Sequence, residues 1–477
     1  MSSNPNDFLD SLFNAAPELR PYLNIGFPFD LVTGVFYQGK HGESVLNGGL
    51  LKVTGVGGRG NMYKSTIMHD MGLNAIDHYH CSTLVAHDSE NSGSPNRYYQ
   101  LAAYLPNIGG VDLAAEKRFN YSDGTTMYGS SWFKGIQQLA EYKAKNKKTF
   151  TRTTMFVDSQ GKNIQVMAPT VGELDSISMM SIEEVAKLFD KAQVGESDLN
   201  AEAMRSSMAK NQMLNQLPFV CGTGNIHMMI SAHVGDEIVT DKYAPSTKKL
   251  AALKGNQKFK QTPEKFTFLT EFLIYCRQLE TMLGSDKMPE FPRKGISYNK
   301  GDSDLQAVTF QILRNKQGPS DVFYDIVVRQ GSGVERSITA LRYLKENRAS
   351  SSEPGWGMSG NTQAYSLDIY PEVTLRRGNV DELINSDPKL CHALEITASM
   401  HQFFNLNHHN CQPEMRCTMK ELYDQLIEKG YDWNVILSET TMRHFFLEET
   451  DSHKNFLSVK DLLNMRLDRY KPYWWKK

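Results

Sequence analysis

The chain has 477 residues, of which 40% are hydrophobic and 22% are charged, and its formal net charge is -2 at pH 7. This length predicts two or three domains, and the charge excludes a globally basic nucleic-acid coat, so any binding of nucleic acid must come from local patches. No apolar run is long enough to span a bilayer and the amino-terminal residues lack a secretory signal, so we expect no membrane association. Six irregularly spaced cysteines are typical of cytosolic thiols, which predicts a cytoplasmic protein.

Strand-like and helix-like patterns alternate along most of the chain, after a short amphipathic segment that we expect to form an amino-terminal arm over residues 1–30. A helix is predicted over residues 65–78, and strands are predicted over 50–56, 83–87, 153–157, 226–231, 305–313 and 322–328. Strands that alternate with helices indicate an α/β fold with a mostly parallel sheet, covered by helices on both faces. We therefore predict an α/β core over residues 31–345.

The composition changes after about residue 346. The segment 350–360 is rich in serine and glycine, which is typical of a loop or a domain boundary. The residues beyond it have mainly helical patterns and end in an aromatic, basic tail. We therefore predict a smaller, mainly helical C-terminal domain over residues 346–477.

A glycine-rich segment joins the first core strand to the helix that follows it. It reads Val56-Gly57-Gly58-Arg59-Gly60-Asn61-Met62-Tyr63-Lys64-Ser65-Thr66. Small residues allow backbone N–H groups to surround a phosphate, and the start of a helix adds the positive end of its dipole. A lysine then reaches the phosphates and a serine hydroxyl binds Mg²⁺, which are the roles predicted for Lys64 and Ser65. Residues 58–66, called the cradle below, are thus predicted to bind a nucleoside triphosphate with Mg²⁺.

The cradle departs at one position from the usual pattern G-x-x-x-x-G-K-[ST]. Gly58 occupies the first glycine position, but Tyr63 stands where the second glycine is expected. The alternative interpretation is a glycine-rich turn between a strand and a helix that carries Lys-Ser by chance. The strands that follow favour the phosphate site, because they add the acidic residues that such a site needs.

Acidic residues follow two of the predicted strands. Glu90 lies just after the strand at 83–87, where an acid beside a triphosphate can orient the attacking water. Asp158 directly follows the strand at 153–157, which is the form of a Walker B element whose aspartate holds Mg²⁺ through water. Each signal alone is weak, because an acid after an apolar run is usually a strand end that meets solvent. Together with the cradle, they are expected to converge at the carboxyl edge of the sheet, where open α/β sheets bind ligands.

In this order, the elements resemble those of RecA-like recombinases, and most closely the UvsX type encoded by tailed bacteriophages. In that type an aromatic residue precedes the lysine, as in Tyr63-Lys64-Ser65. The resemblance covers roughly residues 30–345 and implies a RecA-like P-loop ATPase core that binds and hydrolyses ATP.

The resemblance also implies roles for individual residues. Glu90 would be the catalytic glutamate and Asp158 the Walker B residue. His233 ends a strand similar to the one whose Gln or His senses the γ-phosphate and couples it to DNA. Arg314 and Lys316 are similar to two basic residues that reach the ATP of the neighbouring subunit. The chain would therefore form a homo-oligomer, either a helical filament or a ring.

A lysine-rich segment with interleaved aromatic residues extends over residues 241–267. Lysines can neutralise phosphates while aromatic rings stack on bases, which suits single-stranded DNA. The alternative is a solvated loop, because charge runs usually are solvated. The segment matches the position of the family's second DNA loop, and residues 195–200 resemble the first. The resulting candidate DNA contacts are Lys242, Tyr243, Lys248, Lys249, Lys254, Lys258, Phe259 and Lys260.

These predictions combine into an ATP-dependent DNA recombinase or repair protein, which binds single-stranded DNA and promotes homologous pairing and strand exchange. If the resemblance holds, its compartment is the cytoplasm of a phage-infected bacterium. Two alternatives remain open. One is a hexameric replicative DNA helicase with the same core fold. The other is a nucleotide-gated structural or assembly protein, which would bind ATP but need no lysine-rich loop.

A second cluster of potential ligands lies near the carboxyl end of the chain. It comprises His408, His409, Cys411 and Cys417. Their spacing matches no familiar zinc pattern, so we expect scattered surface histidines and buried cysteines instead of a metal site.

Overall fold

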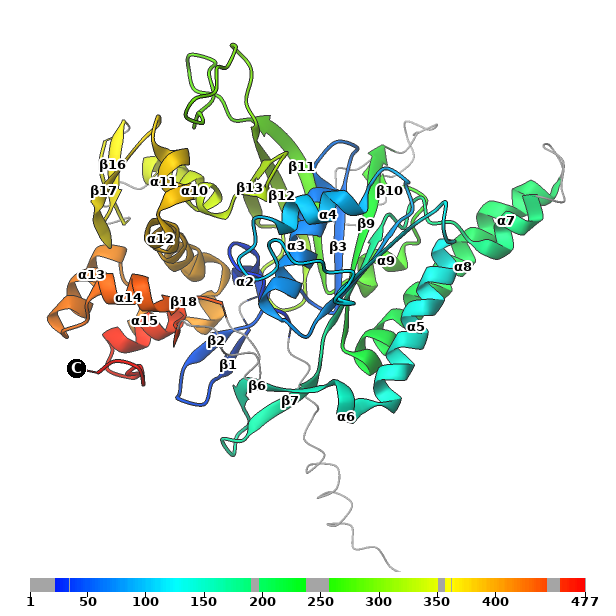
Figure 1. Ribbon diagram of the computed structural model, residues 1–477, viewed down its shortest axis with the longest axis horizontal. Helices are drawn as coiled ribbons and strands as arrows, with labels where there is room; N and C mark the ends of the chain where they lie inside the picture. The colour runs from blue at the N-terminus through cyan, green and yellow to red at the C-terminus, as the bar shows by residue number, and fades with distance from the viewer. Residues whose placement is uncertain are drawn as a thin grey trace, which may run out of the picture.

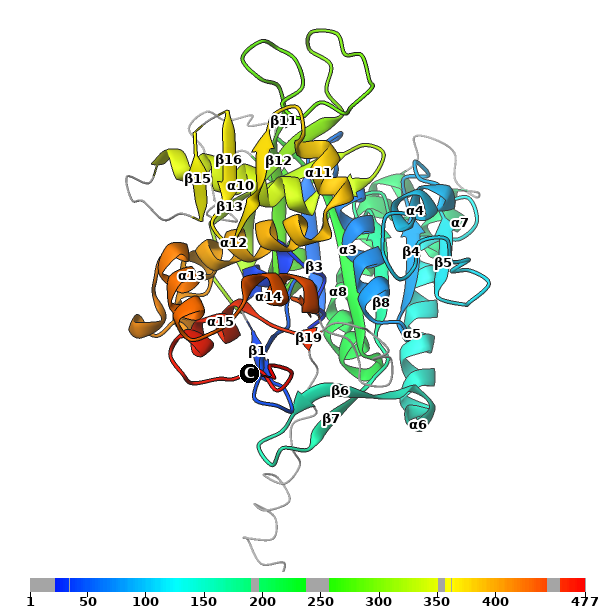
Figure 2. The same ribbon diagram turned by 60° about the vertical axis from the view of Figure 1, so that its left-hand side comes forward.

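The computed structural model describes residues 22–33, 35–189, 197–236, 257–350, 357–361, 363–443 and 455–476. A ten-stranded sheet lies at its centre, between helices (Figures 1 and 2). From one edge to the other its strands are β14 (Gly333–Val334), β13 (Phe323–Arg329), β12 (Leu305–Asn315), β11 (Phe272–Thr281), β3 (Val53–Gly58), β9 (Ile226–Asp236), β8 (Thr170–Asp175), β4 (Thr83–Asp88) and β5 (Phe119–Asp123), and β10 (Gln257–Phe259) pairs with β9 outside this order.

The strands from β11 to β5 run parallel to their neighbours, whereas β10, β12, β13 and β14 pair in the antiparallel direction. The predicted α/β fold with a large, mostly parallel sheet is therefore confirmed. Parallel strands place their carboxyl ends at one edge of the sheet, and there they meet the segment between β3 and the next helix.

Helices cover both faces of the sheet, because residues of its central strand β3 enter two different hydrophobic cores. Val56 of β3 belongs to the core that includes Ile67, whereas Val53 belongs to the core that includes Trp132. The first face is covered by α3 (Lys64–His78) and α4 (Pro95–Ala102), and the second by α5 (Gly129–Lys145) and α8 (Ser197–Gly224). Such two-sided burial accounts for the apolar runs that identified most of the strands.

One predicted strand lies outside the central sheet. β6 (Thr151–Val157) forms a separate two-stranded antiparallel sheet with β7 (Asn163–Met167). β7 leads into the start of β8, and both views place the hairpin beyond that end of the sheet (Figures 1 and 2). The prediction that residues 153–157 form a core strand is therefore wrong, and β8 occupies the expected place. β8 escaped notice because its sequence TVGELD interrupts the apolar pattern with Gly172 and Glu173.

The C-terminal region contains helices and a small sheet that pack on the α/β core. Its elements are α10 (Arg336–Ser350), β15 (Met358–Gly360), β16 (Ala364–Leu367), β17 (Tyr370–Arg376), α11 (Val380–Ser386), α12 (Pro388–Leu406), α13 (Met419–Glu428), α14 (Trp433–Glu439), β18 (Thr440–Thr441), β19 (Asn455–Phe456) and α15 (Val459–Arg466). Leu394 of α12 shares one hydrophobic core with Ile67 of α3. The side chain of Asn407 also donates a hydrogen bond to the Leu31 carbonyl at 2.6 Å. The two regions are thus joined by a continuous buried interface.

The remaining elements are short and connect those above. They are α2 (Phe29–Thr33), β1 (Phe36–Gln38), β2 (Ser44–Leu46), α6 (Lys147–Phe150), α7 (Glu183–Phe189), α9 (Lys265–Leu269) and the 3₁₀ helices η1 (His408–Asn410) and η2 (Pro413–Met415). Within the described ranges, every helix is either too short or too polar to cross a lipid bilayer.

Candidate active site

The cradle follows the end of β3 and opens α3, as predicted. Asn61 and Tyr63 have positive φ angles of 58° and 56°, which is the left-handed conformation that favours glycine. Tyr63 therefore adopts the backbone shape of the glycine that it replaces, at a cost of roughly 1–2 kcal/mol. The ammonium of Lys64 is buried and donates a hydrogen bond to the Arg59 carbonyl at 2.8 Å. The first turn of α3, which is fully described, has no acidic residue, so the cradle has the electrostatics of an anion site.

Three parallel strands end beside the cradle. In β9, His233 pairs in register with Gly58 of β3, and in β4, Asp88 pairs with Asp175 of β8. The hydroxyl of Ser65 forms a hydrogen bond with Asp175. Burial raises the pKa of Asp175 overall, although hydrogen bonds from Ser231 and Ser65 act in the opposite direction and lower it. A buried carboxylate beside the helix-start serine is the arrangement that holds Mg²⁺ next to a triphosphate.

Glu90 and His233 meet at the carboxyl edge of the sheet. Their side-chain atoms Oε1 and Nε2 lie 2.5 Å apart, and each side chain is 26% exposed. The hydrogen bond to His233 lowers the pKa of Glu90, and the charge of Lys64 acts in the same direction. The carboxylate of Asp88 accepts hydrogen bonds from the backbone N–H groups of Glu90 and Gly93, and so shapes the turn that carries Glu90. Glu90 is thus an ionised, partly accessible carboxylate beside the cradle, as a general base requires.

Asp158 does not reach this site. It lies at the turn of the β6–β7 hairpin, where its carboxylate accepts hydrogen bonds from the backbone N–H groups of Gln160 and Lys162. The predicted placement of Asp158 beside the cradle is therefore wrong, and Asp175 is the aspartate that lies there. Each of the two stands at the end of a β-strand, so the local pattern alone could not distinguish them. Only strand pairing shows which of the two strands lies in the central sheet.

This correction can be tested with a matched pair of variants. If the chain hydrolyses ATP, Asp175→Asn is expected to reduce its Mg²⁺-dependent rate by about 10–100-fold, because an aspartate that holds the metal through water is removed. Asp158→Asn should leave the rate unchanged, since that carboxylate stabilises a distant turn. Titration of the rate with Mg²⁺ measures both effects, and thermal unfolding shows whether each variant is folded. A slower rate with Asp158→Asn alone would restore the first assignment.

Behind Asp175 lies a buried polar network that the sequence patterns did not indicate. His69 of α3 forms a hydrogen bond with Glu173 of β8, and the hydroxyl of Tyr98 donates to the same carboxylate at 2.9 Å. Burial lowers the pKa of His69, but the neighbouring Glu173 outweighs it and raises that pKa overall. The network ties α3 and α4 to the strand that carries Asp175. The only sign of this network in the sequence is the charged residue Glu173 within a strand. That sign indicates a buried network only once β8 is known to be buried.

Arg314 and Lys316 lie at the opposite edge of the sheet from the cradle. Arg314 pairs with Leu273 near the start of β11, and the backbone N–H of Lys316 donates to the Glu271 carbonyl. Glu271 in turn lies beside Val53, the first residue of β3. Through β11, Arg314 lies level with Gly55 of β3, three residues before Gly58, and Lys316 lies level with the start of β3. At about 3.3 Å per residue, this offset along the strands is roughly 10 Å for Arg314 and roughly 17 Å for Lys316. Both cations thus lie toward the amino ends of the parallel strands, away from their own cradle.

The candidate DNA segment is described in part. Lys242, Tyr243, Lys248, Lys249 and Lys254 lie outside the described residues, as do residues 195 and 196 of the other candidate loop, while residues 197–200 belong to the start of α8. Lys260 is exposed and Lys258 is half-buried at the start of the returning strand β10.

Phe259 corrects the expectation of an exposed ring that stacks on bases. Its side chain is only 9% exposed and packs edge-to-face on Phe266, with ring centroids 5.4 Å apart. It also covers Gly57, where a Cβ atom would lie 2.6 Å from the ring. Phe259 is therefore a core residue behind the cradle strand. Its alternation with lysines reflects the two faces of β10.

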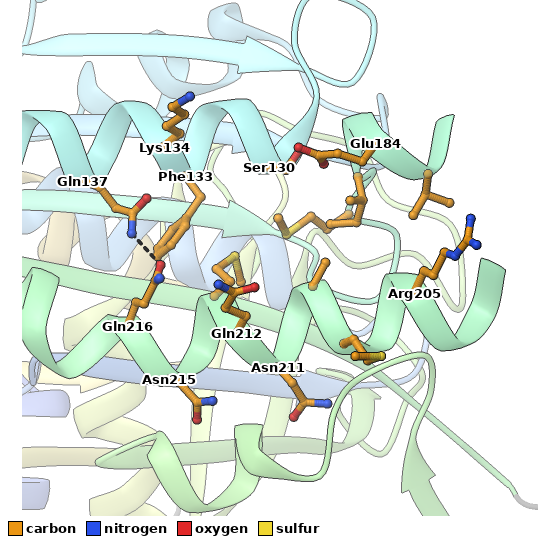
Figure 3. A pocket seen from close by; sticks show the side chains of 16 residues that line it. Ser130, Phe133, Lys134, Gln137, Glu184, Arg205, Asn211, Gln212, Asn215 and Gln216 are labelled. Atoms are coloured by element: carbon orange, nitrogen blue, oxygen red, sulfur yellow. Dashed lines mark hydrogen bonds between the residues drawn. The ribbon is translucent and has the colours of Figure 1, made fainter. Parts of the chain in front are cut away.

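A large cavity lies elsewhere, between α5, α7 and α8, with a volume of about 1030 Å³ (Figure 3). Phe133 and Met208 line it together with several amide side chains, and Gln137 donates a hydrogen bond to Gln216 across it. Its lining residues differ from those of the cradle, Asp175, Glu90 and His233, which we call the strand-end site. The cavity and the strand-end site are thus separate features.

The residues of the strand-end site fit a nucleoside triphosphate with Mg²⁺. Mg²⁺ needs few protein ligands, because phosphate and water oxygens complete its coordination. Among the described residues, no group of three His, Cys, Asp or Glu side chains is arranged to hold a metal ion, either at the strand-end site or at His408, His409, Cys411 and Cys417. Comparison with protein-family models finds no matching family, and comparison with curated proteins finds no match. Function must therefore be inferred from the geometry of the site.

Proposed function

We propose that the chain is an ATPase with a RecA-like core, which hydrolyses ATP with Mg²⁺ and acts on single-stranded DNA as a recombinase or repair protein in the cytoplasm. The observation that carries the proposal is the convergence of four elements at one sheet edge. The cradle supplies Lys64 and Ser65, β8 supplies Asp175, β9 supplies His233, and the turn after β4 supplies Glu90. Phosphoryl transfer requires this set: a phosphate clamp, a metal ligand and a base that orients water.

Each side chain has a separate task in the proposed reaction. Lys64 leaves the Arg59 carbonyl to meet the phosphates, where its charge offsets theirs. Ser65 and Asp175 would hold Mg²⁺, which when bound neutralises part of the phosphate charge. Glu90 accepts a hydrogen bond from the attacking water and orients it toward the γ-phosphate. His233, in contact with Glu90, is placed to respond when a phosphate enters.

Replacement of Lys64 tests the cradle. Lys64→Ala is expected to weaken ATP binding by about 10–100-fold, because a hydrogen bond to a charged group contributes about 1.5–3 kcal/mol. Calorimetric titration with a non-hydrolysable ATP analogue measures this, and Lys134→Ala on α5 is a lysine control away from the site. Equal affinity in the wild type and in Lys64→Ala would show that residues 58–66 do not bind the triphosphate.

The position of the lysine-rich segment favours DNA as the polymer that is bound. β9 ends at Asp236, shortly before the segment, and residues 257–259 of the segment form β10, which pairs with β9 beside His233. An exposed ion pair of 2.8 Å between Arg59 and Asp236 also connects the cradle to the end of β9. A strand of DNA bound there would lie within reach of groups that meet the triphosphate. This placement supports a DNA-dependent ATPase over an assembly protein that binds ATP without needing the segment.

The salt dependence of DNA binding tests these lysines. Replacing Lys248, Lys249, Lys258 and Lys260 with alanine should weaken binding of an oligothymidylate and flatten the slope of log K against log salt. The slope is expected to fall by about 0.7 for each phosphate that a lysine no longer neutralises. Replacing Lys420 and Lys429, which have acidic partners in the C-terminal region, is the matched control. An unchanged slope would assign the four lysines to a solvated loop.

A further inference from the structure

Ser178 lies at a junction between the strand-end site and the lysine-rich segment. It follows Asp175 by three positions and is 3% exposed. Its hydroxyl oxygen accepts a hydrogen bond from the backbone N–H of His233 at 2.9 Å, and the hydroxyl donates to the carbonyl of Lys260, also at 2.9 Å. One side chain thus connects the end of β8, the sensor position on β9 and the residue that follows β10.

Lys210 of α8 reinforces this junction from the other side. Its ammonium donates hydrogen bonds to the carbonyls of Ser178 at 3.1 Å and of Gln261 at 3.3 Å. The residue is 4% exposed, and burial lowers the pKa of Lys210 to about 8. Among the described residues, no carboxylate forms an ion pair with it. A buried amine held by carbonyls alone costs desolvation energy, so stability is a poor explanation for its presence.

These contacts form a continuous path. Gln261 and Lys260, which follow β10 within the lysine-rich segment, contact Lys210 and Ser178. Ser178 contacts the backbone of His233, and the imidazole of His233 contacts Glu90. Every step is a hydrogen bond that is partly shielded from solvent. A shift of β10 when a strand binds to the segment would therefore be transmitted to the group that positions Glu90.

We propose that Lys210 and Ser178 are positioning residues that couple DNA bound at the lysine-rich segment to the Glu90–His233 pair. This inference rests on the proposed function, because it specifies how DNA would regulate the same site. Neither residue touches the triphosphate. The backbone N–H of Lys260 also donates to the His233 carbonyl at 2.8 Å, and the two side chains reinforce this direct link between β10 and β9, so that hydrolysis and DNA binding influence each other.

The test uses Lys210→Met, which keeps the stem and removes the donors, and Ser178→Ala in the full chain. Stimulation of ATP hydrolysis by poly(dT) is expected to fall about 5-fold or more, whereas the KM for ATP without DNA stays near the wild-type value. Lys210→Arg should restore part of the stimulation, since it keeps a charged donor. Lys134→Met is the matched control, because Lys134 is an exposed lysine of α5, the helix that packs on α8, and lies outside the lysine-rich segment.

Reciprocity separates coupling from a merely structural role. In the wild type, a non-hydrolysable ATP analogue should raise the affinity for an oligothymidylate, and the oligothymidylate should raise the affinity for the analogue by the same factor. In Lys210→Met and Ser178→Ala, both increases in affinity should be lost, again by one common factor. A structural defect would instead lower DNA affinity equally with and without the analogue. Ser178→Ala keeps the test decisive if Lys210→Met fails to fold, as judged by thermal unfolding.

The outcomes distinguish this inference from the proposed function. Undiminished stimulation and an undiminished analogue effect in a folded Ser178→Ala or Lys210→Met variant would overturn the coupling while leaving the ATPase intact. A wild-type chain that hydrolyses ATP without any response to DNA would overturn both the DNA-dependent function and the coupling. Loss of stimulation with Lys134→Met as well would attribute the effect to general disturbance of α5 and α8, and so would also overturn the coupling.

Discussion

A Glu90→Gln variant is expected to lose ATP turnover by about 10²–10⁴-fold, the usual contribution of a positioned general base, while keeping its affinity for ATP. The amide has nearly the size of the carboxylate and can still form a hydrogen bond with His233, so the turn held by Asp88 should persist. What it lacks is the basic oxygen. Single-turnover hydrolysis measures the chemical step, and titration with a fluorescent ATP analogue measures binding.

The surface glutamate Glu141 of α5 provides the control for this change. Glu141→Gln removes the same charge and should alter neither quantity. If Glu90→Gln turned over ATP at nearly the wild-type rate, the base would have to be sought among the neighbouring acids. Asp88 stands two residues before Glu90, but it already accepts two backbone hydrogen bonds in the turn.

Alanine at both Arg314 and Lys316 is expected to slow hydrolysis by about 10³-fold or more, the effect of losing cations supplied in trans to a phosphoryl-transfer site. These residues lie at the far edge of the sheet from their own cradle. The proposal therefore requires that one copy of the chain completes the site of the next. Specific activity should accordingly rise with protein concentration even at saturating ATP and DNA.

Mixing two inactive variants tests this dependence directly. A subunit with Arg314→Ala and Lys316→Ala keeps an intact cradle and Glu90, whereas a Glu90→Gln subunit keeps both cations. In a mixture, the first can receive cations from the second, so part of the activity should return. The matched mixture of Glu90→Gln with Lys64→Ala should stay inactive, because one subunit lacks the base and the other lacks the phosphate clamp. Absence of recovery, with activity independent of concentration, would show that each subunit works alone.

Electron microscopy with ATP and single-stranded DNA distinguishes the possible assemblies. A helical filament supports the recombinase, and a closed ring supports a helicase of the same core fold. Both use cations from a neighbouring subunit, so the mixing experiment alone does not separate them. Single particles without neighbours would contradict both assemblies.

Local structure could be predicted from the sequence wherever it depends on adjacent residues. The cradle needs small residues, a lysine and a serine in continuous order, so its place after β3 and at the start of α3 followed from residues 58–66 alone. Glu90 was found for a similar reason, because it follows an apolar strand closely. The α/β class was predicted from the alternation of strands and helices, since the period of apolar residues depends on local geometry.

The tertiary structure decided everything that depends on which strands pair. Asp158 and Asp175 each stand at the end of a strand, yet only β8 lies beside β4 and β9 in the central sheet. Phe259 alternates with lysines as a base-stacking ring would, yet pairing of β10 with β9 turns it onto Gly57. Strand pairing joins residues far apart in the chain and depends on the summed packing of both faces of the sheet. No local pattern contains that sum, and for this reason the sequence predicted the glycine-rich turn between β3 and α3 whereas the fold determined which acid stands beside it.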